Sequence, residues 1–150
     1  MSLKDQITED MKNAMRAKAA DRLSAIRMLL AAIKQKEIDE RIAVDDGQVT
    51  AIVEKLVKQR KDSIDQFQQA GRVDLVTKEA AELELLQGYL PKQASADEVA
   101  SELAAAIASS QAKGPQDMGK VMAVLKSKLA GRVDMSVLSA QVKARLSGTV

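Results

Sequence analysis

Apolar residues recur at helical spacing along most of the chain. The first set is Leu3, Ile7, Met11 and Met15. A spacing of four places these side chains on one face of a helix, which we expect to begin after Ser2 and to end near Lys18. A second set, from Leu23 to Ile33, has the same period and predicts a second helix that Asp21 caps. The short connection favours antiparallel packing of the two helices.

Polar residues with capping spacing mark the starts of later helices. Asp45 with Gln48, and Ser95 with Glu98, have the spacing of capping boxes. The string Ala-Gly-Arg-Val-Asp occurs at residues 70–74 and again at 130–134. Its glycine is suited to end one helix and its aspartate to cap the next. We therefore interpret both copies as junctions between helices.

Pro91 disfavours helical geometry at Leu90, so we expect a domain boundary there. The whole pattern predicts an all-α protein of about seven helices. Four would form an N-terminal helical domain, residues 1–91, and three a small basic tail domain, residues 92–150.

The composition agrees with close helix packing. Hydrophobic residues make up 46% of the chain, 24 residues are alanine, and Phe67 and Tyr89 are the only aromatic residues. The longest apolar runs have six residues, whereas a membrane span needs about 20. The chain has no cysteine, and charged residues stand where a signal peptide would be apolar. We therefore expect a cytoplasmic protein that does not interact with membranes.

Catalysis is limited by what the chain lacks. Without histidine or cysteine, histidine-based triads, cysteine nucleophiles and the usual zinc sites are excluded. Glu79 and Glu82, three residues apart on a helix, could hold magnesium or act as an acid–base pair. We favour a solvated helix face instead, because acids near a helix N-terminus offset its macrodipole. We predict no catalytic residue, metal or cofactor, so the protein is more an accessory protein than an enzyme.

The stretch from Gly114 to Lys120 partly matches a phosphate-binding loop. Val121 follows the lysine, where such a loop has Ser or Thr, and a helix is expected before the first glycine in place of a strand. A turn between helices is therefore the better interpretation.

Positive charge is concentrated near the C-terminus. Residues 1–92 hold 16 basic and 16 acidic side chains, whereas residues 118–150 hold one acidic residue, Asp134, against six basic ones. The basic residues are Lys120, Lys126, Lys128, Arg132, Lys143 and Arg145. They lack neighbouring acids in the sequence, so we take them as candidate RNA contacts. By contrast, we expect Lys58 and Lys61 to pair with Asp62 and Asp65 on a solvated helix face.

The type of nucleic acid is only partly constrained. Two aromatic residues are too few for stacking on unpaired bases, which disfavours single-strand binding. The last predicted helix carries polar residues of the kind that read DNA, but recognition of a folded RNA by shape and phosphate fits at least as well.

Three stretches support a family resemblance: RLSAIRMLLAAIKQKEID from Arg22, KQRKDSIDQFQQAGRVDLVTKEAAELELLQGYLP from Lys58, and DMGKVMAVLKSKLAGRVDMSVLSAQVKARL from Asp117. They resemble the YqeY family (GatB/YqeY), which is similar to the C-terminal helical and tail region of GatB, one of the subunits of the glutamine-dependent aspartyl/glutamyl-tRNA amidotransferase. The resemblance implies an all-α fold and recognition of folded tRNA, with Lys120, Lys126, Lys128 and Arg132 as candidate phosphate contacts.

The amidotransferase is a carbon–nitrogen ligase, but its catalytic machinery lies in domains other than the region that this chain resembles. The resemblance therefore does not imply that the chain is an enzyme. We predict a non-catalytic tRNA-binding accessory module whose partners are folded tRNA and a protein of tRNA aminoacylation or amidation. The alternative is a protein–protein adaptor that binds no RNA.

Overall fold

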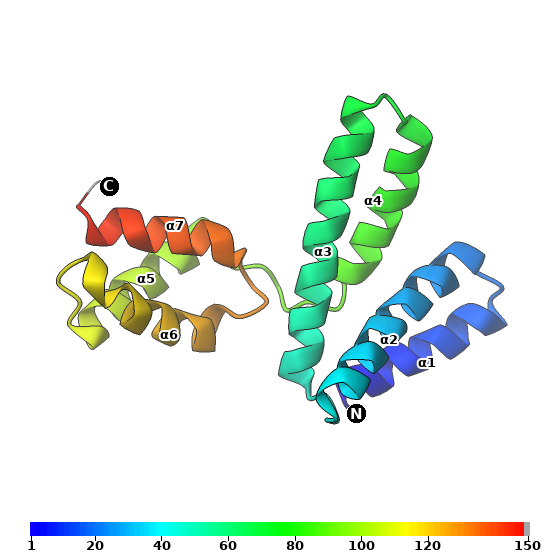
Figure 1. Ribbon diagram of the computed structural model, residues 1–150, viewed down its shortest axis with the longest axis horizontal. Coiled ribbons are helices and arrows are strands. Elements are labelled where there is room, and N and C mark those ends of the chain that lie inside the picture. Colours follow the sequence, from blue (N-terminus) through cyan, green and yellow to red (C-terminus); the bar gives the residue numbers. More distant parts are fainter. Residues whose placement is uncertain (149–150) are drawn as a thin grey trace. The chain divides into compact units, whose positions relative to one another are not determined.

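The computed structural model describes residues 1–148, and these residues form helices and no strands (Figure 1). The all-α prediction is therefore confirmed for this part of the chain. The chain separates into two compact units, Met1–Leu90 (unit 1) and Pro91–Val150 (unit 2). The elements are α1 (Leu3–Arg16), α2 (Ala20–Glu40), α3 (Asp46–Gln69), α4 (Val73–Gln87), α5 (Ala96–Ser110), the 3-10 helix η1 (Pro115–Asp117), α6 (Met118–Leu129) and α7 (Met135–Leu146).

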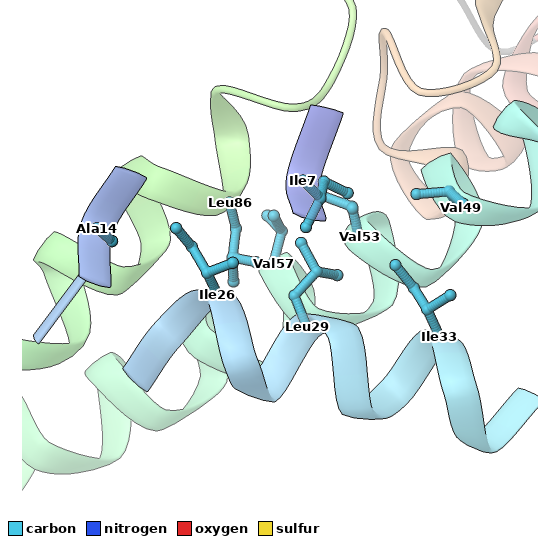
Figure 2. Close-up of a cluster of buried hydrophobic side chains, with 9 residues drawn as sticks. All are labelled: Ile7, Ala14, Ile26, Leu29, Ile33, Val49, Val53, Val57 and Leu86. Carbon is cyan, nitrogen blue, oxygen red and sulfur yellow. The ribbon is translucent and has the colours of Figure 1, made fainter. Parts of the chain in front are cut away.

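Unit 1 consists of two helical hairpins, α1–α2 and α3–α4. Its buried core combines aliphatic side chains from all four helices (Figure 2). The members are Ile7, Ala14, Ile26, Leu29, Ile33, Val49, Val53, Val57 and Leu86. Each large aliphatic side chain contributes about 1.5–3 kcal/mol through removal from water. These positions follow the helical period in the sequence, so the amphipathic pattern accounts for the core.

The two hairpins share this core over only part of their length. In α3, the buried residues Val49, Val53 and Val57 all lie in its first half. In α4, only Leu86, close to the C-terminal end, is buried. The outer parts of α3 and α4 therefore pack mainly on each other, and the hairpins diverge away from the shared core (Figure 1).

Local capping explains where several helices begin. Ser2 accepts a hydrogen bond from the Asp5 amide, and Asp45 exchanges capping bonds with Gln48, as predicted. Asp21 and Asp74, which we expected to be caps, instead lie at the second position of α2 and α4. Neither helix has a side-chain cap. An aspartate in the first turn still interacts favourably with the N-terminal dipole, which is why the sequence signal misplaced both starts by two residues.

Unit 2 packs α5, α6 and α7 around a separate core. Val99, Leu103 and Ala106 of α5 meet buried side chains of the other two helices. Those side chains are Val121, Leu125, Leu129, Leu138 and Val142. Gly131, with φ of +75°, comes shortly after the end of α6 and allows the chain to turn into α7.

Candidate nucleic-acid interface

The six predicted RNA-contact residues are distributed over both ends of unit 2. Within this unit α6 and α7 run in opposite directions, so the end of α7 lies beside the start of α6 (Figure 1). Lys128 and Arg132 lie at and just after the C-terminal end of α6, whereas Lys143 and Arg145 occupy the last turn of α7. The residues that form one basic cluster in the sequence therefore form two groups in the structure.

At one end, acids from α5 neutralise the basic residues. Lys128 Nζ lies 3.3 Å from Glu102 Oε2, and Arg132 Nη2 lies 2.5 Å from Glu98 Oε2. We expected both cations to lack acidic neighbours, and this expectation is wrong. The acids lie upstream, on the helix that packs against α6, so counting charge over residues 118–150 missed them.

Arg132 fixes the local backbone as well. Its Nε donates to the Lys92 carbonyl over 3.0 Å, and its own carbonyl accepts a hydrogen bond from the Ala94 amide over 2.7 Å. The guanidinium also lowers the pKa of Glu98, chiefly by hydrogen bonding to the carboxylate. Arg132 thus joins the segment before α5 to the turn between α6 and α7. Its side chain is 30% exposed, and two of its guanidinium nitrogens, Nε and Nη2, are engaged in these contacts.

At the other end, positive charge is in excess. We call Lys113, Lys120, Lys143 and Arg145 the basic end of unit 2; all four are exposed. Asp117 is the acid near them: it lies 3.8 Å from Lys120 Nζ and accepts a 2.9 Å hydrogen bond from the Lys113 amide.

A small hollow of about 260 Å³ lies at this basic end. Lys113 and Arg145 line it together with apolar side chains of α5 and α7, among them Ile107 and Leu146. Within residues 1–148, neither cation forms an ion pair, and neither does Lys143. Two unpaired cations beside an apolar hollow are suited to a phosphate group attached to a less polar moiety.

Lys113 was missing from the sequence prediction, because we counted charge from residue 118 onward. A count that began at the start of the unit would have included it. Lys126, which the sequence did single out, is exposed and forms no ion pair in the described part of the chain. It lies in the last turn of α6, where its charge offsets the helix dipole.

Glu79 and Glu82 do not form the solvated face that we expected. They lie 3.2 Å and 3.1 Å from Arg60 of α3, and the three side chains are only 13–17% exposed. A further Arg60 nitrogen, Nη2, lies 2.9 Å from Met28 Sδ. No pattern in the sequence pointed to this cluster, because its members lie on two helices of a hairpin.

The expected pairs of Lys58 with Asp62 and Lys61 with Asp65 are absent from the ion pairs of residues 1–148. In the same range, no group of three acidic residues could hold a metal ion. The stretch from Gly114 to Lys120 forms η1 and the first turn of α6, a junction between helices as predicted.

Comparison with known proteins identifies the family. A model of the YqeY family, described as Yqey-like protein, matches residues 4–146. The chain belongs to the YqeY family. Proteins similar to it include several named "Altered inheritance of mitochondria protein 41, mitochondrial". The Eremothecium gossypii protein is 46% identical over 98 residues, which cover 63% of this chain and 54% of the relative. The Pyrenophora tritici-repentis protein is 31% identical over 128 residues, 82% of this chain and 71% of the relative.

These relatives also correct an expectation. The matched part of the chain spans about half of the length of the Eremothecium gossypii protein. Both relatives are named as mitochondrial, which contradicts the cytoplasmic location predicted from the sequence. The lack of cysteine excluded disulfides but does not discriminate between these two compartments. Separately, none of the helices in residues 1–148 is both long and apolar enough to cross a membrane.

Proposed function

We propose that this YqeY protein is a non-catalytic tRNA-binding accessory module and that the basic end of unit 2 supplies its phosphate contacts. The observation that carries the proposal is the group of exposed cations, Lys113, Lys143 and Arg145, that form no ion pair within residues 1–148. Cations without acidic partners remain available to a polyanion.

The charge balance of each unit supports the choice of unit 2. Residues 91–150 hold eight basic and five acidic side chains, whereas residues 1–90 hold 15 basic and 16 acidic ones. A phosphate backbone is therefore attracted to unit 2 and not to unit 1 as a whole. The resemblance of the tail to the tRNA-recognition region of the amidotransferase supports tRNA as the RNA.

The pairing pattern ranks the candidate residues. We assign direct phosphate contact to Lys113, Lys143 and Arg145, which form no ion pair within residues 1–148. Lys120 joins them because its Nζ lies as far as 3.8 Å from Asp117 and its side chain is 71% exposed. Lys126 is an outlying contact. Lys128 and Arg132 would have to leave Glu102 and Glu98 before binding a phosphate, so we assign them a structural role.

Fluorescence-anisotropy titration of labelled folded tRNA, and of a random RNA duplex of equal length, tests the proposal over a salt series. We expect tRNA to bind more tightly than the duplex, with log affinity falling linearly with log salt concentration. Equal affinity for the two RNAs would contradict specific tRNA recognition. Absence of binding at low salt would favour the alternative function, a protein–protein adaptor without RNA.

A further inference from the structure

Unit 1 contains a groove that the tRNA proposal does not use. It has a volume of about 870 Å³ and lies between α4 on one side and α1 and α2 on the other. It forms because the two hairpins share a core near Leu86 and diverge beyond it. Its volume is in the range of specific binding sites in proteins.

The groove follows α4 from Asp74 in the first turn to Gly88 at the C-terminal cap. Since α4 has 15 residues, the wall that α4 contributes is about 22 Å long at the helical rise of 1.5 Å per residue. This is the length of a helix of about 15 residues.

Small and apolar side chains lie along the groove. Ala25 of α2, which is buried, lines it with Ala81 and Leu85 of α4, and Gly88 follows at the end of the groove. Small residues at a helix surface let another helix approach closely, because the distance between packed helix axes depends on the side chains at the contact. The groove therefore suits an occupant with an apolar stripe.

Carboxylates line both walls and outnumber the cations. The carboxylates are Asp10, Asp21, Asp74, Glu82 and Glu84, and the cations are Arg22 and Lys78. Arg72 pairs with Asp74, and Arg60 is shared between Glu79 and Glu82. These pairs leave Asp10, Asp21 and Glu84 against Arg22 and Lys78, so the lining keeps a small excess of negative charge. Within residues 1–148, Asp21 on one wall and Glu84 on the other form no ion pair.

Tyr89 holds one end of the groove in place. Its hydroxyl donates a 2.6 Å hydrogen bond to Asp10 Oδ2, which links α1 to the segment after α4. The Tyr89 hydroxyl is protonated at neutral pH, and burial together with this hydrogen bond raises its pKa further above the ordinary value. The bond therefore persists at neutral pH and keeps the Asp10 side chain at the groove.

We propose that this groove binds an amphipathic, lysine- or arginine-rich α-helix of a partner protein. The apolar stripe of such a helix would pack on Ala81 and Leu85, and its cations would lie near Asp21 and Glu84 on the two walls. The excess of carboxylates repels a phosphate backbone, so RNA is not the occupant. The groove therefore carries charge of the opposite sign to the basic end of unit 2.

The probe for this proposal is a fluorescein-labelled peptide of about 15 residues, with leucines at helical spacing and lysines elsewhere. A scrambled peptide of identical composition has the same charge but no apolar stripe. The test variant is Asp21→Lys with Glu84→Lys. The matched control is Asp62→Lys with Asp65→Lys, because these exposed acids of α3 lie outside the groove and change the net charge equally.

We expect the amphipathic peptide to bind at least about tenfold more tightly than the scrambled one. The groove variant should weaken binding by about tenfold, and the control should leave it within about twofold. Far-UV circular dichroism of both variants checks that the helices are retained.

Three results would overturn the proposal. The first is equal binding of the two peptides, and the second is equal weakening by the two variants, since either indicates non-specific charge attraction. The third is a chain that self-associates in sedimentation experiments and loses self-association in the groove variant, because the occupant would then be a second copy.

Discussion

In the two copies of Ala-Gly-Arg-Val-Asp the glycine has the same role, but the arginine forms different contacts. Gly71 and Gly131 have φ of +70° and +75°, so both end a helix as their sequence predicts. Arg72, however, pairs with Asp74 two residues away, whereas Arg132 reaches Glu98 on another helix. A local backbone requirement can be predicted from the sequence. The partner of a long side chain cannot, because it depends on which helix packs beside it.

The contact between Arg132 and Glu98 predicts a dependence of stability on pH. Since the pKa of Glu98 is lowered in the folded state, this contribution is present above the unfolded pKa of about 4.3 and is lost as pH falls through the folded pKa. Glu98→Gln should therefore lower the free energy of unfolding at pH 7 and show a smaller loss than the wild type on acidification. Urea unfolding from pH 7 to pH 3 measures both effects. Parallel pH profiles for the two proteins would refute the assignment.

Removal of Arg60 should lower the free energy of unfolding more than removal of the contact between Arg132 and Glu98. The reason is that Arg60 and its two carboxylates are mostly buried. Arg60→Met leaves Glu79 and Glu82 close together without a cation. We expect a loss of about 2–4 kcal/mol in the free energy of unfolding. Adding Glu79→Gln and Glu82→Gln to this variant should restore part of the loss, as measured by urea denaturation. An Arg60→Met variant with an unchanged free energy of unfolding would contradict the prediction.

At the scale of helices, the sequence predicted boundaries well where capping chemistry is local. Ser2 and Asp45 cap their helices as expected, and glycines follow the ends of α3 and α6. The box expected at Ser95 is half formed: Ser95 accepts from the Glu98 amide, but the Glu98 carboxylate binds Arg132. Arg132, from a distant part of the sequence, thus competes with the Ser95 backbone amide for the Glu98 carboxylate. The sequence pattern does not show which of the two contacts is the stronger.

Two glycines in open space test backbone conformation separately from packing. A Cβ added at Gly71 or Gly119 would meet no atom within 4 Å, but only Gly71 has a positive φ. Gly71→Ala should therefore destabilise the protein by about 1 kcal/mol. Gly119→Ala, in the first turn of α6, should stabilise it by up to about 1 kcal/mol. Thermal unfolding of both variants measures this, and shifts of the same sign would contradict the account.

At the scale of the whole molecule, hydrophobic periodicity accounts for two cores that have no residue in common. The candidate site was predicted less completely. The sequence correctly found a basic C-terminal region, but its pairing with acids of α5 and the contribution of Lys113 follow from how the helices of unit 2 pack. Charge counted along a chain therefore locates a basic unit without identifying its available cations.

Separate cores predict separate responses to cavity-forming substitutions. Leu29→Ala in unit 1 and Leu125→Ala in unit 2 each remove a fully buried side chain and should cost about 2–5 kcal/mol. We expect each variant to lower only the unfolding transition of its own unit, as followed by calorimetry or residue-resolved hydrogen exchange. If Leu125→Ala lowered protection equally in both units, the two would unfold together.

The central claim is that the unpaired cations at the basic end contact tRNA phosphates. The most direct measurement compares the salt dependence of tRNA affinity in two variants with equal charge loss. One replaces Lys113, Lys143 and Arg145 with Gln, and the other replaces Lys55, Lys58 and Lys61, exposed cations of α3 in unit 1. We predict that the first variant binds more weakly, with a slope of log affinity against log salt that is smaller by about 2–3, while the second keeps the wild-type slope. Equal slopes for the two variants would contradict the claim.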